Sequence, residues 1–191
     1  MATTLTHFRG RNDDGDETTA TWKAAEDTNW TQQVDTNFRV RFKVQNDTSA
    51  INNLDVLLQY SLNGGAFTAV SATSSVIRSS ASPNLADQAN LTVQLTAGTG
   101  TFIGATSFDE VNGICGGTAL DLTATGNMEN EFCVQLRSAD VVHGDSIQIR
   151  TINSDSGAPR TTYNVTCTIM ANRGATGIPL MPIKRFMMTG Q

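Results

Sequence analysis

The sequence predicts an all-β protein, an antiparallel sandwich of two sheets. Three observations support this fold class: apolar and polar residues alternate with a period of two, β-branched and aromatic residues fill the apolar positions, and turn residues separate the alternating runs. No run shows a convincing helical period. The spacing of the runs predicts roughly seven to nine short strands.

The clearest pair of strands lies between residues 37 and 65. The first run alternates apolar residues with cations, in the order Phe38, Arg39, Val40, Arg41, Phe42, Lys43 and Val44. The second run covers residues 54–62 and ends at Asn63-Gly64-Gly65, where residues that tolerate positive φ let the chain reverse. Residues 66–70 can then return antiparallel. Alternation of this kind predicts a sheet with one dry face and one face in water.

Later runs repeat the pattern. They are residues 76–78, 91–95, 132–136, 147–149 and 163–169. Residues 104–130 are rich in glycine and weakly periodic, which predicts a long loop with one short strand at 120–123. Long loops of this kind tend to be functional or contact surfaces. Short strands separated by turns, without helices, favour an immunoglobulin-like topology.

The first 35 residues are expected to form an N-terminal arm with a hairpin. Residues 5–11 and 18–24 are β-prone, and the turn residues 12–16, with an Asp-Gly step, separate them. A calcium loop is the alternative, because four acidic residues gather here: Asp13, Asp14, Asp16 and Glu17. Their spacing does not match an EF-hand, so a solvated turn is the favoured interpretation.

The chain changes character after residue 170. A flexible spacer precedes an apolar segment with two prolines, which remove backbone donors and exclude both a helix and a central strand. We expect this segment to be an extended arm that docks on a neighbouring subunit, with fold-back on its own domain as the alternative. Its predicted partner-binding residues are Ile178, Pro179, Leu180, Met181, Pro182, Ile183, Phe186 and Met187. The expected division is an N-terminal arm and hairpin (1–35), a β-sandwich domain (36–170) and an apolar C-terminal arm (171–191).

Charge and hydropathy limit the classes of partner that the protein can bind. With 13 Lys and Arg against 18 Asp and Glu, the net charge of −5 argues against nucleic acid, because phosphate binding needs an excess of basic residues. No run approaches the roughly 18 apolar residues of a membrane span, and the N-terminal residues do not resemble a signal peptide. We therefore expect a soluble protein, made in a cytoplasm, that binds neither nucleic acid nor membrane.

Residues that could carry catalysis or ligate a metal are sparse. His7 and His143 are the only histidines, and neither has a Cys or His at metal-ligand spacing. The sequence contains no nucleophile-elbow, Walker, dinucleotide-binding or zinc-protease motif, so we expect no enzyme, no cofactor and no metal. The three cysteines are expected to be reduced, with a Cys115–Cys133 bridge as the alternative.

Five segments resemble a module of tailed-phage virion proteins that also occurs in prophage-rich bacterial genomes. They are residues 11–15 (RNDDG), 17–22 (ETTATW), 35–42 (DTNFRVRF), 58–65 (LQYSLNGG) and 132–140 (FCVQLRSAD). The resemblance covers roughly residues 9–170. The module is structural and non-enzymatic, so the resemblance implies no catalytic residues.

The resemblance implies a structural protein of the virion, made in the host cytoplasm. A decoration (cement) protein on the major capsid lattice is the leading expectation, because the module stands nearly alone with short arms and an acidic net charge suits an outer surface. Its partners would be the major capsid protein, copies of itself, or both, in a homo-oligomeric assembly. A tail, baseplate or fibre component and a carbohydrate-binding host-attachment module are the alternatives.

Overall fold

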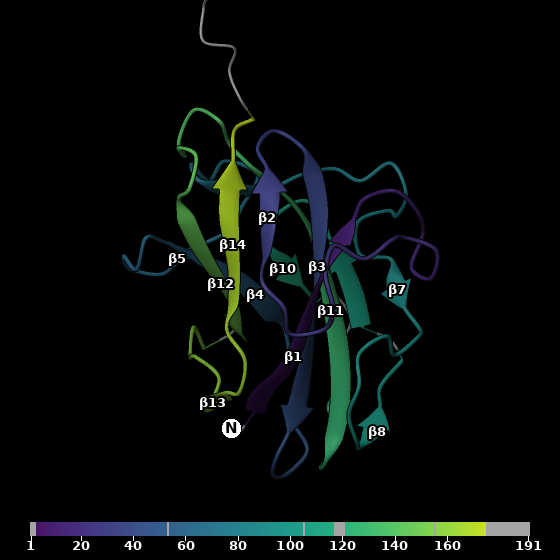
Figure 1. The fold of residues 1–191 in the computed structure, drawn as a ribbon. Helices are drawn as coiled ribbons and strands as arrows, with labels where there is room; N and C mark the ends of the chain where they lie inside the picture. Colours follow the sequence, from purple (N-terminus) through teal and green to yellow (C-terminus); the bar gives the residue numbers. More distant parts are fainter. Residues whose placement is uncertain (1–2, 53, 105, 117–120, 155, 175–191) are drawn as a thin grey trace, which may run out of the picture.

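The computed structural model describes residues 3–52, 54–104, 106–116, 121–154 and 156–174 (Figure 1). All of the regular structure in these ranges is β, which confirms the predicted all-β class. In chain order the strands are β1 (Thr3–Asn12), β2 (Trp30–Gln33), β3 (Asn37–Asn46), β4 (Val56–Leu62), β5 (Thr68–Ala69), β6 (Ile77–Ser79), β7 (Asn90–Leu91), β8 (Thr101–Phe102), β9 (Thr106–Asp109), β10 (Ile114–Cys115), β11 (Gly126–Leu136), β12 (Ser146–Asn153), β13 (Thr162–Tyr163) and β14 (Cys167–Asn172).

The strands form two sheets. Sheet A runs in the order β13-β1-β3-β11-β9-β7, with β6 and β8 also paired to β11. Sheet B runs in the order β10-β4-β12-β14-β2, with β5 paired to β4. Residues from both sheets share one apolar cluster, an arrangement consistent with a β-sandwich.

Both sheets are mixed, whereas the sequence predicts antiparallel ones. β1 pairs in parallel with β13, β2 with β14, and both β8 and β9 with β11. Chain order explains the first two pairs, because the N-terminal strands lie beside strands from the C-terminal part and no hairpin links them. Alternation reveals which residues of a strand share a face, but it does not reveal which strands are neighbours.

β1 lies inside sheet A, although the sequence predicts an N-terminal arm. It pairs with β3 along its whole length and with β13 on its other side. The predicted hairpin is reduced to one bridge between Arg11 and Trp22. The Trp22 ring also stacks on the Arg9 guanidinium, at 3.9 Å from the ring centroid. The first part of the chain therefore supplies β1 to sheet A and β2 to sheet B.

The core follows the predicted alternation closely. Phe38, Val40, Phe42 and Val44 of β3 are all fully buried in the apolar cluster. Trp30 of β2 packs edge-on against Phe38, with the ring centroids 6.0 Å apart. Opposite this ring the chain has Gly10, where a Cβ would lie 2.9 Å from carbons of Trp30.

The second face of β3 is buried as well, which corrects the predicted wet face. Arg39, Arg41 and Lys43 are each 0% exposed. Residues 13–28 and 80–97 cover this face, and their backbone carbonyls accept hydrogen bonds from all three cations. Cations alternate along a strand in the same way whether their face is exposed to water or buried under hydrogen-bonding partners. The period alone could therefore not distinguish an exposed face from a buried one.

The predicted long loop over 104–130 contains β9, β10 and the start of β11. β11 is buried on both faces from Gly126 to Val134, which removes the alternation by which a strand is recognised. The short strand predicted at 120–123 is represented by one bridge between Leu122 and Ile51. In the described ranges, no helix has the length and apolar character needed to cross a membrane.

Candidate functional site

Charged side chains gather between sheet A and the segments that cover it. Strand register builds this group: Arg41 of β3 pairs with Glu131 of β11, and Lys43 pairs with Glu129. Alternate residues of a strand point to the same side, so these side chains share one face. The group, here the charge cluster, consists of Arg11, Asp13, Glu17, Arg39, Arg41, Lys43, Glu129 and Glu131.

Glu131 is the centre of the charge cluster. Its carboxylate oxygens lie 3.1 Å from Arg11 Nη1, 3.3 Å from Arg39 Nη1 and 3.0 Å from Arg41 Nη1. Arg41 also donates through Nε to Glu129 at 2.5 Å. The side chains of all five residues are 0% exposed. Charges this deep are tolerated only when they are paired and hydrogen-bonded.

Burial and charge pairing act in opposite directions on the cations of the charge cluster. Its four cations are matched by four carboxylates, so the formal charges cancel. Burial lowers the pKa of Arg11 and of Lys43 from their ordinary values. At Arg41 burial acts in the same direction, but the charges of Glu131 and Glu129 outweigh it and the pKa is raised. Cations and carboxylates that bind one another in this way are suited to holding the fold together rather than to transferring protons.

Residues 92–97, here the strap, cross the charge cluster where the sequence predicts a strand. Pairing with β9 stops at Leu91. Beyond it, backbone N–H groups of the strap donate to carboxylates. Glu17 accepts from Thr92 and Val93 at 2.9 Å, Glu129 from Leu95 and Thr96 at 2.9 and 2.8 Å, and Glu26 from Ala97 at 2.9 Å.

Cations of β3 bind the carbonyl groups of the strap. Arg41 Nη2 donates to the carbonyl of Val93 at 2.6 Å, and Lys43 Nζ donates to that of Ala97 at 2.8 Å. The Thr96 hydroxyl donates a further bond to Glu129. Side chains thus provide the hydrogen-bond partners that a neighbouring strand would provide to the backbone of a strand. This explains why the residues of the strap alternate as predicted but do not form a strand.

His7 lies beside two carboxylates at one end of the strap. Its Nδ1 is 2.7 Å from Asp27 and 3.3 Å from Glu26. Within the described part of the chain this is the one group of His, Cys, Asp and Glu side chains close enough to share a metal ion. Glu26 also holds the N–H of Ala97, and Asp27 accepts from the N–H of Phe8 at 2.9 Å. These bonds account for the arrangement by themselves.

The acidic residues of the first turn do not converge on one point. Asp16 accepts from the N–H groups of Thr18 and Thr19, which together hold its pKa well below the ordinary range. Asp14 binds Thr21, and Asp13 belongs to the charge cluster. Each carboxylate serves a different local bond, so the favoured turn interpretation holds for Asp14 and Asp16, while Asp13 and Glu17 point inward.

The remaining candidate nucleophiles are buried. The cysteines Cys115, Cys133 and Cys167 are free thiols, and burial raises the pKa of each above its ordinary value. A protonated thiol is a poor nucleophile. His143 lies exposed in the turn before β12.

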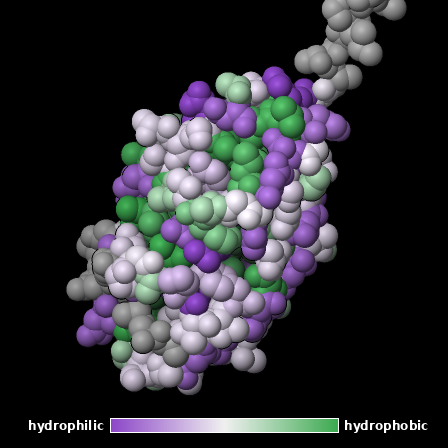
Figure 2. All heavy atoms as spheres, turned by 90° about the vertical axis from the view of Figure 1, so that its left-hand side faces the viewer, coloured by the Kyte–Doolittle hydropathy of each residue, from purple (hydrophilic) through white to green (hydrophobic). Residues whose placement is uncertain are grey.

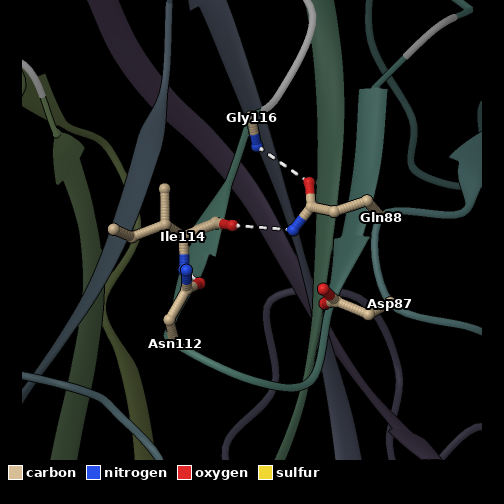
Figure 3. A pocket seen from close by; sticks show the side chains of 5 residues that line it. All are labelled: Asp87, Gln88, Asn112, Ile114 and Gly116. Carbon is tan, nitrogen blue, oxygen red and sulfur yellow. Dashed lines mark hydrogen bonds between the residues drawn. The ribbon is translucent and has the colours of Figure 1, made fainter.

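A small pocket of about 260 Å³ opens beside β10 (Figure 3). Gln88 reaches across it, and its amide donates to the carbonyl of Ile114 at 3.2 Å and accepts from the N–H of Gly116 at 3.4 Å. Asp87 points into the same space (Figure 3). Gln88 therefore supplies hydrogen-bond partners that β10 would otherwise need from another strand. Among the residues that line this pocket, no base is placed against a nucleophile.

The outer face of sheet B is accessible. Outward side chains of β12 and β14 are half-buried or exposed: Gln148, Arg150, Thr168 and Met170. Figure 2 shows this side of the molecule, where hydrophobic residues lie in patches among polar ones. Met170 and Val142 are exposed large apolar residues, and a backbone bond from Gly144 to Ala171 links the turn carrying Val142 to β14.

The predicted arm lies outside the described residues. Ile178, Pro179, Leu180, Met181, Pro182, Ile183, Phe186 and Met187 all fall beyond residue 174, where the described chain stops. Their docking therefore stays a prediction. The described chain stops two residues after β14, on the accessible sheet.

Neither the charge cluster nor the strap is among the sites predicted from the sequence. A signal for the cluster was present: Glu129 and Glu131 alternate on one strand as Arg39, Arg41 and Lys43 do on another, and opposite charges at the same period favour pairing in register. The strap had no comparable signal, because its partners come from residues distant in the sequence.

Comparison with known proteins adds no family. No protein-family model and no curated protein matches the chain.

Proposed function

We propose that the protein is a non-enzymatic structural component of a phage virion, most specifically a decoration protein bound to the major capsid lattice. The immunoglobulin-like topology and the apolar C-terminal arm belong to this proposal, as does localisation in the virion. The sequence resemblance over roughly residues 9–170 supplies the virion assignment.

One observation carries the proposal: the buried charged groups of the charge cluster are used to hold the fold together. Glu131, Glu129 and their arginines bind one another and hold the strap. The accessible face of sheet B is a surface on which a partner could bind, and the described chain stops two residues after β14 of that sheet. A protein arranged in this way is suited to contact rather than to turnover.

A carbohydrate-binding module receives less support. Such modules present exposed aromatic rings to sugar faces, whereas the exposed large apolar residues of the described chain are Val93, Val111, Val142 and Met170. The two tryptophans are engaged, because Trp30 lies in the core and Trp22 stacks on arginines.

The test is to label the protein on purified particles and to image intact virions and separated heads and tails. Signal distributed over the head supports decoration. Signal confined to the tail or its tip overturns decoration in favour of a tail, baseplate or fibre component. Absence from purified particles overturns the virion assignment itself.

A second experiment addresses the arm. A chain lacking residues 178–191 should keep its two-sheet fold but fail to enter particles, if apolar docking of the arm holds it there. A matched full-length variant with Ile178, Leu180 and Ile183 replaced by serine keeps the chain length and should fail in the same way. Normal incorporation of both variants would exclude the arm as the anchor.

A further inference from the structure

The strap is attached to the fold in an unusual manner. No backbone-to-backbone hydrogen bond connects residues 92–97 to a strand of the described chain. Glu17, Glu26 and Glu129 accept hydrogen bonds from its N–H groups, and Arg41 and Lys43 donate to the carbonyls of Val93 and Ala97. A segment held only by side chains can separate without breaking any sheet ladder.

We infer that the strap is a releasable closure over the charge cluster. The strap opens as a unit when the carboxylates that bind it, Glu17, Glu26 and Glu129, lose their charge, while both sheets stay folded. Ionised carboxylates accept two or more N–H bonds, and a hydrogen bond to a charged group is stronger than one between neutral groups. A protonated carboxyl keeps less acceptor capacity and turns an O–H toward a neighbouring N–H donor. Closure therefore depends on charge rather than on burial of apolar surface.

The ionisable groups that bind the strap, or that belong to the same network of charges, come from β1, β3, β11 and residues 13–28. β1 contributes His7 and Arg11, β3 contributes Arg41 and Lys43, and β11 contributes Glu129 and Glu131. Residues 13–28, which cover sheet A, contribute Glu17, Glu26 and Asp27. The strap itself has no ionisable side chain. Acid can therefore act on closure only through these neighbours, and Glu17, Glu26 and Glu129 are the carboxylates that bind the strap directly.

The pH at which the strap opens follows from Glu17. Burial acts to raise its pKa, but the N–H groups of Val93 and Thr92 together with Arg41 outweigh burial, and the pKa falls below its ordinary value of 4.5. A carboxylate with a lowered folded-state pKa stabilises closure above its ordinary pKa, and that contribution is lost as the pH falls through the lowered value. The strap should stay closed at neutral and mildly acidic pH and open in stronger acid.

Neutralising one carboxylate at neutral pH tests the inference without acid. In Glu17→Gln the strap loses its charged acceptor at one end, and thermolysin should cut before Val93 or Leu95 at least about tenfold faster than in the wild type. Asp16→Asn is the matched control, because it neutralises the neighbouring turn residue, whose carboxylate binds only Thr18 and Thr19. Cleavage sites are mapped by mass spectrometry, and far-UV circular dichroism checks the fold.

Hydrogen exchange provides the second measurement on the full chain. Between about pH 6 and about pH 3, protection of the strap amides corrected for intrinsic rates should fall while protection of β3 and β11 is kept. If Glu17→Gln does not fold, Glu26→Gln tests the other end, since that carboxylate holds Ala97. Equal cleavage of the variants and the wild type, or loss of strap protection only together with the sheets, would overturn the inference.

Discussion

Arg41 and Glu131 lie side by side in sheet A, joined by a bond of 3.0 Å from Arg41 Nη1 to Glu131 Oε2, and neither side chain reaches solvent. The pair couples β3 to β11 on the face opposite the apolar core, because the two residues are register partners. Sheet A is thus held by an apolar layer on one side and an ionic layer on the other.

The first prediction concerns the centre of the ionic layer. Glu131→Ala leaves three buried guanidinium groups without their shared carboxylate, and the free energy of unfolding should fall by about 3–5 kcal/mol. Urea denaturation at neutral pH measures it. The matched control is Asp140→Asn, which breaks the partly exposed pair with Arg137 and should cost about 0–1 kcal/mol. A small loss at Glu131 would contradict the central role given to it.

Crowding at Gly10 gives the second prediction. Gly10→Ala places a methyl group 2.9 Å from carbons of the Trp30 ring, and overpacking of this kind costs about 1–3 kcal/mol. Gly157→Ala is the comparison, because its Cβ would meet open space and only its positive φ of 63° opposes the change, at about 1–2 kcal/mol. Thermal unfolding should rank Gly10→Ala as the more destabilised; the reverse order would show that Trp30 can move away.

The third prediction uses Asn130, on the core side of β11. Neither atom of its side-chain amide has a hydrogen-bond partner among the described residues, and the residue is fully buried. An unpaired buried amide costs about 1–3 kcal/mol. Asn130→Leu, of similar size, should therefore raise the denaturation midpoint. Asn127→Leu is the control, because the Asn127 amide donates to Thr99 and the substitution removes that bond. A midpoint lowered by Asn130→Leu would reveal a partner for the amide.

Asp109 gives a prediction of pH dependence. Burial, as the largest effect, raises the pKa of this carboxyl from 3.8 to about 6, despite an N–H bond from Gly113. The folded state then binds the proton more tightly than the unfolded state, so this residue's contribution to stability falls as the pH rises from about 4 to about 6. The difference in free energy of unfolding between the wild type and Asp109→Asn should change over that interval and stay constant above it. A difference independent of pH would contradict the raised pKa.

The apolar half of the fold could be predicted because it obeys one simple rule. Phe38, Val40, Phe42 and Val44 alternate, and all lie in the core. The polar half could not be predicted in the same way, because Arg39, Arg41 and Lys43 show the same alternation whether they face water or carboxylates. Parallel pairing and the strap depend on contacts between distant residues, such as Glu17 with Val93, and no local pattern encodes those.

The candidate site was predicted least well, for a related reason. The sequence drew attention to residues 178–187 as an apolar segment, and these lie outside the described residues. The turn residues Asp13 and Glu17 were recognised as a charged group, but their destination in the charge cluster follows from the path of residues 80–97 over sheet A. Charge type is visible in a sequence, whereas burial of that charge depends on the tertiary structure.

The positions of β1 and β2 also govern how the chain can fold during synthesis. β1 gains its second neighbour only when β13 has left the ribosome, and β2 has β14 as its paired strand. Both emerge early and must wait for residues 162–172. Pairing over such separations is slow, and unpaired edges invite contact with other nascent chains. Translation pauses before residue 162 should therefore increase aggregation.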